Sequence, residues 1–231
     1  MSAHYSHYDA LENMKKAVAD GHHRAVIGGM WDELGALQKR FLLSQGLQPH
    51  HRFIDMGCGS LRAGVPLTEY LDADRYYGVD ISADLLEAGY EREIIPAGLG
   101  AKLSRDHLSA NPDFDATGFG VMFDYGIAQS VFTHMPISRL TDCLSALAPV
   151  YAEGGRFYVT FFERPADAAP EAPLPHEPGG VVTYPDRDPF DTTLAALKAA
   201  TPNGWRLEVL GSWDHPRDQR MALFVRETGQ D

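Results

Sequence analysis

The sequence predicts an α/β fold in which a mostly parallel sheet carries helices on both faces. From Arg52 onward, short apolar segments typical of strands alternate with amphipathic segments typical of helices. The first of these strands runs directly into a glycine-rich turn, "DMGCGS". The last two are joined only by "DHPRDQ", which is too short for a crossover and so predicts an antiparallel hairpin at the sheet's edge.

The residues before the sheet are expected to be helical. Residues 8–20 have moderate helix propensity. After the glycine pair 28–29, large apolar residues recur at helical spacing, namely Trp31, Leu34, Leu37, Phe41 and Leu42. Gly46 is suited to end this helix. We therefore divide the chain into an N-terminal helical extension or lid, residues 1–50, and one sheet-containing domain, residues 51–231.

Within the domain, the pattern predicts seven strands and four helices. The strands are "RFIDM", "YYGVDI", a weak one between Ala101 and Asp115, "MFDYGIAQS", "GGRFYVTFF", "WRLEVLGSW" and "RMALFVRE". The helices are "LRAGVPLTEYL", "ADLLEAGYERE" with Ser82 as N-cap, "ISRLTDCLSALAPV" and "FDTTLAALKAA". Residues 164–190 are rich in proline and are expected to form a loop without regular elements, as lids and binding loops often do.

Composition narrows the class of protein. The chain has 231 residues, 44% of them hydrophobic, and a formal net charge of −12. This charge argues against nucleic acid as a partner, because such binding rests on Lys and Arg neutralising phosphates. The N-terminal residues lack the apolar core of a signal peptide, and no run approaches the length of a membrane span. We expect a cytoplasmic protein with no membrane partner and with Cys58 and Cys143 reduced.

The glycine turn has the chemistry of a nucleotide site. Gly57 and Gly59 permit positive φ and a close approach of a ligand to the backbone. A dinucleotide fingerprint would need a third glycine where the chain has Arg62, and a phosphate-binding Walker loop would need G-K-[ST], which does not follow. Asp80 ends the second strand about 20 residues beyond Gly59, where a carboxylate can accept hydrogen bonds from two ribose hydroxyls. The expected ligand therefore has a free ribose and no diphosphate.

Four segments in order resemble the class I S-adenosylmethionine (SAM)-dependent methyltransferases. They are "FIDMGCGS", "YYGVDIS", "FDYGIAQSVFTHMP" and "LAPVYAEGGRFYVTFFE". The resemblance covers Arg52 to about Phe162 well and the last two strands loosely. It implies a Rossmann-like domain that uses SAM and releases S-adenosylhomocysteine (SAH). The family's usual third glycine is replaced here by Leu61.

The resemblance also implies roles for individual residues. Gly57 and Gly59 would pack against the methionine part of the cofactor, and Asp80 would bind the ribose. Asp55 would orient the turn or reach the cofactor's ammonium through water. An acid near the adenine amino group is expected at Asp113, with Phe114 beside the ring; Asp115 and Asp106 are the alternatives. Gln129 and Ser130 would line the methionine. Arg62 either pairs with the cofactor carboxylate or is a solvated cation on the first helical turn.

Candidate catalytic and acceptor-binding residues come from the loops and from the N-terminal helices. His134, in "SVFTHMP" just after the fourth strand, is the candidate general base, and a structural role is its alternative. Candidate residues for binding the methyl acceptor are Tyr5, Trp31, Glu163, His176 and Tyr184. Trp31 has core packing as its alternative, and His215 and Arg217 are expected to anchor their loop. The four N-terminal histidines lack the spacing of a known metal site, so no metal is expected.

The leading functional hypothesis is methyl transfer to oxygen or nitrogen of a small-molecule acceptor. A protein or peptide methyltransferase is one alternative, which would require an extended groove. An enzyme that uses the same cofactor for cyclisation or elimination is another, because the motifs identify the cofactor and not the reaction. A cofactor-binding module without catalysis is the fourth.

Overall fold

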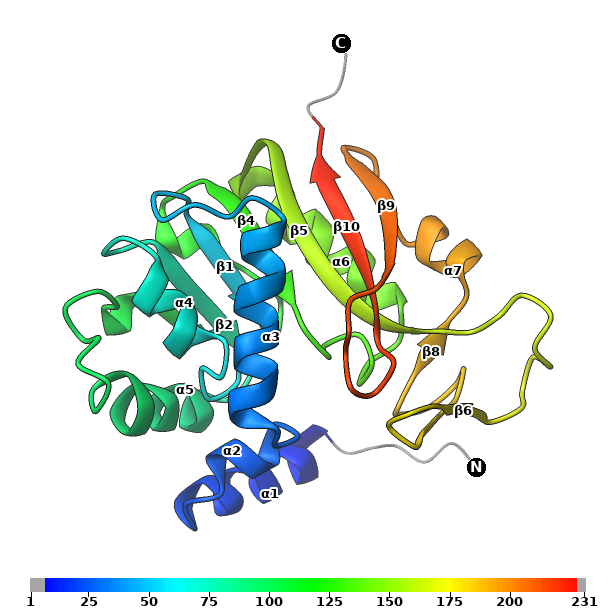
Figure 1. The fold of residues 1–231 in the computed structure, drawn as a ribbon, viewed down its shortest axis with the longest axis horizontal. Coiled ribbons are helices and arrows are strands. Elements are labelled where there is room, and N and C mark those ends of the chain that lie inside the picture. The colour runs from blue at the N-terminus through cyan, green and yellow to red at the C-terminus, as the bar shows by residue number, and fades with distance from the viewer. Residues whose placement is uncertain (1–6, 228–231) are drawn as a thin grey trace.

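One mixed sheet runs through the molecule in the order β3-β2-β1-β4-β5-β10-β9 (Figure 1). The computed structural model describes the backbone of residues 7–227 and the side chains of residues 12–227. The five parallel strands are β1 (Phe53–Met56), β2 (Tyr76–Asp80), β3 (Leu108–Ala110), β4 (Phe123–Ala128) and β5 (Tyr151–Glu163). The predicted hairpin is confirmed: β9 (Trp205–Ser212) and β10 (Arg220–Arg226) pair antiparallel, and β10 pairs antiparallel with β5.

The proline-rich segment contains more structure than the sequence predicted. Directly after this segment, an eighth strand of the main sheet, β8 (Asp191–Thr192), pairs with the end of β5. The expectation that residues 164–190 form a loop without elements is wrong, because β6 (Leu174–His176) and β7 (Val181–Thr183) form a separate two-stranded sheet. Buried polar side chains hold this hairpin in place. Thr183 Oγ1 donates to Asp191 Oδ2 at 2.6 Å, and Asp191 in turn accepts from Arg164.

The N-terminal segment forms α1 (His7–Ala19), α2 (His23–Val26) and α3 (Trp31–Ser44). α1 and α2 lie at the same end of the sheet as the loop between β9 and β10 (Figure 1). α3 packs on the sheet itself, where Phe41 meets Tyr158 and Trp213 edge-on at 5.3 and 5.4 Å between ring centroids. Gly46, with φ +93°, follows the end of α3 as the sequence predicted.

The remaining helices connect the strands. They are α4 (Gly64–Tyr70), α5 (Ala83–Gly89), α6 (Ser138–Leu147) and α7 (Leu194–Ala199). The Ser82 hydroxyl accepts from Leu85 N, so the predicted N-cap of α5 is confirmed. α5 continues as one π-helical turn, Tyr90–Ile94. Short 3₁₀ turns occupy Arg105–His107, Thr117–Phe119 and Ala148–Val150.

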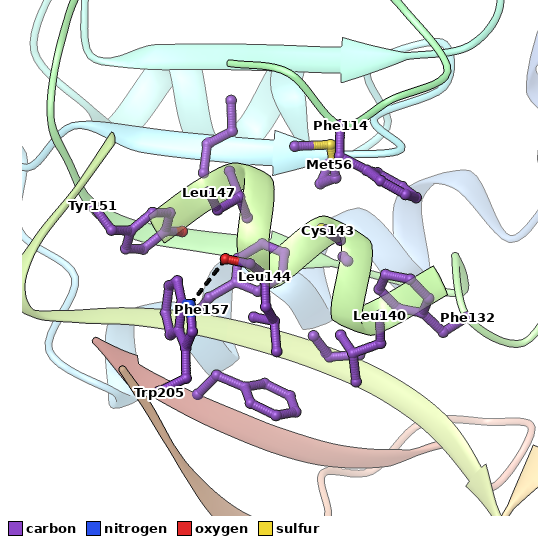
Figure 2. Close-up of a cluster of buried hydrophobic side chains, with 14 of the residues drawn as sticks. Met56, Phe114, Phe132, Leu140, Cys143, Leu144, Leu147, Tyr151, Phe157 and Trp205 are labelled. Carbon is purple, nitrogen blue, oxygen red and sulfur yellow. Dashed lines mark hydrogen bonds between the residues drawn. The ribbon is translucent and has the colours of Figure 1, made fainter. Parts of the chain in front are cut away.

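Two hydrophobic clusters lie on opposite faces of the sheet, because successive strand residues point to opposite sides. On β1, Phe53 belongs to the cluster under α3 and α4, and Ile54 belongs to the cluster under α6 and α7. Figure 2 shows the second cluster, in which α6 presents Leu140, Leu144 and Leu147 and the indole of Trp205 donates to Leu144 O at 2.9 Å. The two clusters fix which strand residues point to each face of the sheet. The carboxyl ends of the parallel strands lie together at one edge.

Cys58 and Cys143 are both buried and free, and they belong to different hydrophobic clusters. Within residues 7–227, none of the helices has the length and apolar character that crossing a membrane requires.

Candidate functional site

A cavity of about 1040 Å³ lies at the carboxyl ends of β1, β2, β4 and β5. Two groups of residues enclose it. The first, which we call the strand-end wall, consists of Asp55, Gly57, Gly59, Asp80, Phe114, Gln129 and Ser130. The second, the covering wall, consists of Ile27 and Gly28 before α3, Leu34 and Gln38 on α3, and His215, Arg217 and Gln219 between β9 and β10. Arg62 lies between the two and also lines the cavity.

Glycine is required at two positions of the turn because the backbone has positive φ there and because a side chain would have no room. Gly57 has φ +75°, and a Cβ there would lie 2.4 Å from Val131 Cγ2. Gly59 has φ +55°, and its Cβ would lie 2.9 Å from Ile27 Cγ2. The amides of Gly57 and Cys58 both donate to Val79 O, and these two hydrogen bonds attach the glycine turn to β2. A side chain at either glycine would therefore disturb the wall of the cavity.

Leu61, at the position where the motif that this turn resembles has a third glycine, keeps the left-handed conformation. Its φ is +67°, a region that costs a non-glycine residue on the order of 1–3 kcal/mol. The Leu61 side chain is fully buried in the cluster under α3 and α4, and burying a leucine contributes about 1.5–3 kcal/mol. Burial of the side chain therefore offsets the strain, and the turn follows the path that a glycine would allow.

Asp80 accepts hydrogen bonds from the glycine turn after β1 and from the turn after β2. Its Oδ2 accepts from Gly59 N at 2.8 Å and its Oδ1 accepts from Ser82 N at 2.9 Å. Burial raises the pKa of this carboxyl, and the backbone amides of Ser82 and Gly59 oppose the shift by favouring the charged form. The carboxylate lines the cavity, so it presents a fixed acceptor beside the glycine turn.

Asp55 is deeply buried at the base of the turn, with 3% of its surface exposed. The Tyr76 hydroxyl donates to its Oδ2 at 2.7 Å. Burial raises the pKa of Asp55 to about 7, although the Tyr76 hydrogen bond and the Arg62 charge pull it downward. Burial thus disfavours the charged form of this carboxyl at the base of the turn.

Arg62 joins the strand-end wall to the covering wall. One terminal nitrogen, Nη1, donates to Ile27 O at 3.2 Å and Gly29 O at 2.9 Å, and Nη2 donates to Gln129 Oε1. The residue is 8% exposed, so the interpretation as a solvated cation is wrong. Burial lowers the pKa of Arg62 to about 10, with the Asp55 charge opposing the shift, and the guanidinium remains charged at neutral pH.

Hydrogen bonds link three polar side chains that line the cavity, Gln129, Ser130 and Gln219. Gln129 Nε2 donates to Ser130 Oγ, and Gln219 Nε2 donates to the same oxygen at 2.8 Å. Ser130 has φ +61°, and its amide donates to Thr160 Oγ1 at 2.7 Å. The network places the predicted residues Gln129 and Ser130 in the cavity and adds Gln219, which sequence reasoning missed.

Two more residues of the β9–β10 loop line the cavity. Arg217 Nη2 donates to Gly28 O at 3.0 Å, which is the loop-anchoring role that the sequence suggested. His215 was assigned only that role, but its ring is buried, stacks on Trp213 and lines the cavity. Its Nδ1 accepts from Arg217 N at 3.2 Å. Burial, together with the Arg217 and Arg62 charges, lowers the pKa of His215 to about 4, so the ring is neutral at physiological pH.

Of the residues predicted around adenine, Phe114 lines the cavity and Asp113 does not. Phe114 has φ +59°, packs on Phe132 at 6.0 Å between centroids, and lies under the Arg139 guanidinium. Asp113 and its two alternatives, Asp106 and Asp115, line a separate hollow of about 520 Å³. Asn111 borders both spaces, and its position directly after β3 is the signal that could have identified it.

His134 lies at the rim of the cavity and has a carboxylate partner. Its Nδ1 lies 2.7 Å from Asp188 Oδ1, and 60% of the His134 side chain is exposed. Asp188 comes from the proline-rich segment, which Phe190 N secures by donating to Thr133 O at 2.7 Å. Both side chains line the cavity, and sequence reasoning gave no role to Asp188.

Of the predicted acceptor-binding residues, the structure describes four, and none of these four lines the cavity. Tyr5 falls outside the residues that the structure describes. Trp31 packs against His23 and lies under the Arg24 guanidinium at 4.7 Å. Glu163 pairs with Arg220, and the Arg187 guanidinium lies over the Tyr184 ring. His176 is buried, with Nε2 2.9 Å from Thr183 Oγ1. No group of three or more potential metal ligands is found in the part of the chain described.

Comparison with known proteins identifies the fold. No family model matches the sequence. Magnesium protoporphyrin IX methyltransferase from Synechocystis PCC 6803, solved with SAM, is 17% identical; the match covers 98% of this chain and 100% of that one, with a TM-score of 0.61. DhpI, solved with SAH, is 15% identical over 99% and 100% of the two chains, with a TM-score of 0.63. CcbJ from Streptomyces caelestis, a methyltransferase, is 13% identical over 84% and 90%, with a TM-score of 0.58.

The chain thus has the Rossmann-like fold of the class I SAM-dependent methyltransferases, as the four sequence segments predicted.

Proposed function

We propose that this protein is a SAM-dependent methyltransferase that acts on oxygen or nitrogen of a small-molecule acceptor. One observation carries the proposal: the glycine turn and the Asp80 carboxylate meet in one large cavity at the carboxyl ends of the strands, with Asp80 Oδ2 2.8 Å from Gly59 N. Ligands of open α/β sheets bind at this edge. The same fold in proteins solved with SAM and SAH supports the choice of cofactor.

The strand-end wall fits such a cofactor. Asp80 is a buried acceptor suited to ribose hydroxyls, and Phe114 offers an aromatic surface for adenine on the β3 side. The Gly57–Gly59 backbone admits close approach of the thioether and methionine carbons. Arg62 lines the cavity and stays charged at neutral pH, which suits a carboxylate.

Held by the glycine turn and Asp80, SAM would supply an electrophilic methyl group to the acceptor's lone pair, and SAH would be the product. The leaving group is already good, so the protein contributes mainly proximity and alignment. The proton displaced from a hydroxyl or ammonium acceptor needs a base. We assign this role to the free Nε2 of His134, whose Nδ1 is oriented by Asp188 at 2.7 Å.

The size and enclosure of the cavity favour a small acceptor over a polypeptide chain. A volume of about 1040 Å³ stands at the upper end of the roughly 300–1000 Å³ typical of ligand sites, which leaves space for an acceptor beside the cofactor. The covering wall closes one side, through Arg62 and Arg217 bound to the backbone before α3.

Two measurements test the proposal. Isothermal titration calorimetry with SAH should show binding, and NAD, which carries a diphosphate, should not bind. Incubation with methyl-labelled SAM and a metabolite panel, sorted by hydroxyl, amine and carboxylate groups, should give label transfer with SAH formed in equal amount. Failure of SAH to bind would reject the cofactor. Consumption of SAM without SAH would indicate cyclisation or elimination instead.

A further inference from the structure

One arginine of the cavity lining has accessible donors that no other described residue uses. Among the described residues, the arginines that line the cavity are Arg62, Arg139 and Arg217. Arg62 donates to two backbone oxygens through Nη1, and Arg139 donates to Asp142 at 2.6 Å. The Arg217 guanidinium has a single hydrogen bond in the described part of the chain, from Nη2 to Gly28 O at 3.0 Å. Its Nε and Nη1 are not buried atoms, so a ligand can reach both.

The positive charge of Arg217 is not neutralised by the acids of the cavity. Each of these acids already has a hydrogen-bond partner within the protein, and they are Asp55, Asp80 and Asp188. The Arg217 charge lowers the pKa values of Arg62 and His215, so its field extends into the lining. An anion bound beside Arg217 would reduce the repulsion between the two guanidinium groups. This part of the lining therefore suits an anionic ligand.

His215 adds a second donor next to Arg217. Its Nδ1 accepts from Arg217 N at 3.2 Å, so the proton of the neutral ring lies on Nε2. This Nε2 lies 3.4 Å from Gln129 Nε2, which is also a donor because the Gln129 oxygen accepts from Arg62 Nη2. The two N–H groups cannot satisfy each other. A carboxylate oxygen placed beside Arg217 would give the His215 N–H an acceptor.

The backbone of Arg217 lies on the side of the cavity where the proposed base is held. A Cβ on Gly179, in the β6–β7 turn, would lie 2.6 Å from Arg217 Cα, so the two segments are packed together. Val181 follows in β7 and lines the cavity, as does Asp188 further along the same segment. Phe162, near the end of β5, is a second apolar residue of the lining. A ligand bound here would meet a cation and apolar surface together.

We propose that the methyl acceptor is an organic acid whose carboxylate binds to Arg217 and His215. A guanidinium pairs with a carboxylate through charge-assisted hydrogen bonds, which are stronger than neutral ones. The hydrophobic body of the acid lies against Phe162 and Val181. The hydroxyl or amine that receives the methyl group is a separate group of the same molecule, directed toward His134. This inference rests on the proposed function, because it takes this part of the cavity to hold the acceptor.

Benzoate and benzamide test the carboxylate site, since they have the same ring and similar size and differ in charge. Calorimetric titration into SAH-saturated wild-type protein should show benzoate binding at least 10-fold more tightly than benzamide. Arg217→Gln should weaken benzoate binding at least 10-fold and leave benzamide unchanged, because glutamine can still donate to Gly28 O but carries no charge. Arg206→Gln is the matched control. It removes the same charge from an exposed ion pair with Glu208 outside the cavity and should bind benzoate as the wild type does.

A second pair of ligands separates the acceptor from the cofactor. SAH carries a carboxylate, whereas 5′-methylthioadenosine has the same adenosine and thioether and none. Arg217→Gln should bind both as the wild type does. Selective weakening of SAH would assign Arg217 to the cofactor and overturn the inference.

The remaining outcomes distinguish this inference from the proposed function. Absence of benzoate binding to the wild type, equal binding of benzoate and benzamide, or unchanged benzoate binding by Arg217→Gln would each overturn the carboxylate site. If the wild type does not bind SAH, the proposed function fails. Titration of benzoate into the ligand-free protein would then still show whether Arg217 binds a carboxylate.

Discussion

The two walls of the cavity are built on different physical principles. The strand-end wall depends on backbone conformation over a few residues, as in Gly57 and Gly59, and on a carboxylate at a strand's end. The covering wall depends on side chains that reach distant backbone, such as Arg62 to Gly29 across 33 residues and Arg217 to Gly28 across 189. The first kind of wall leaves a pattern in the sequence, and the second leaves almost none. The following predictions test this difference, in order of expected effect.

The largest effect is expected at the rim, where a residue of the β4 turn meets the proline-rich segment. His134→Ala should lower turnover about 10²-fold or more, the usual contribution of a general base, and leave SAH affinity nearly unchanged. Asp188→Asn should lower turnover less, because the ring loses its orienting carboxylate and keeps its base. Asp186→Asn, on the same segment and paired only with Arg187, is the control. Equal turnover in His134→Ala and the wild type would return His134 to a structural role.

The next effect tests the strand-end wall. Asp80→Ala should weaken SAH binding by roughly 100-fold or more, because hydrogen bonds to a charged acceptor contribute about 1.5–3 kcal/mol each and two ribose contacts are lost. Asp113→Ala should bind SAH as the wild type does, since Asp113 lies outside the cavity. Calorimetry on both variants would check this. A loss at Asp113 as large as that at Asp80 would contradict the arrangement of the adenine end.

The glycine turn allows conformational strain to be separated from steric conflict. Gly57→Ala should destabilise the protein by about 2–4 kcal/mol, of which about 1 kcal/mol is the cost of the left-handed backbone and the rest the conflict with Val131. Gly98→Ala, at φ +73° in open space, should show the backbone cost alone. Chemical denaturation of both measures the difference. If the two variants lose equal stability, crowding by Val131 does not contribute.

The smallest effect concerns the pH dependence of stability, which one buried group in each wall should change in opposite directions. Asp55 has its pKa raised to about 7, so the folded state holds more protons than the unfolded state from about pH 4 to 7, and this contribution to stability falls as pH rises. His215 has its pKa lowered to about 4, so the unfolded state holds more protons from about pH 4 to 6.5, and its contribution rises with pH.

The two trends oppose each other in the wild type and should separate in variants. Between pH 4 and 6.5, Asp55→Asn should become more stable relative to the wild type as pH rises, and His215→Gln should become less stable relative to it. Denaturation at pH 4.5, 5.5 and 6.5 would check both slopes, with Asp113→Ala as a carboxyl control. Parallel curves for all the variants would show that neither group carries a shifted pKa.

The sequence by itself determined the positions of the main strands along the chain, the closing hairpin, the glycine turn, the cap at Ser82 and the acid at Asp80. These features follow from alternation of apolar residues and from conformational preferences that act within a few residues, so a single sequence displays them. The hydrophobic cluster under α6 also follows from helical spacing of its leucines.

Only the tertiary structure decided which side chains enclose the cavity. The loop after β3 turns at Phe114, with φ +59°, and directs Phe114 inward while Asp113 lines the other hollow. His176 and Glu163 are engaged by Thr183 and Arg220 and do not reach the cavity. Gln38, His215 and Gln219 reach it because α3 and the β9–β10 loop fold over the strand ends. Such contacts join segments far apart in the chain, and their energies depend on packing and burial that exist only once the fold has formed.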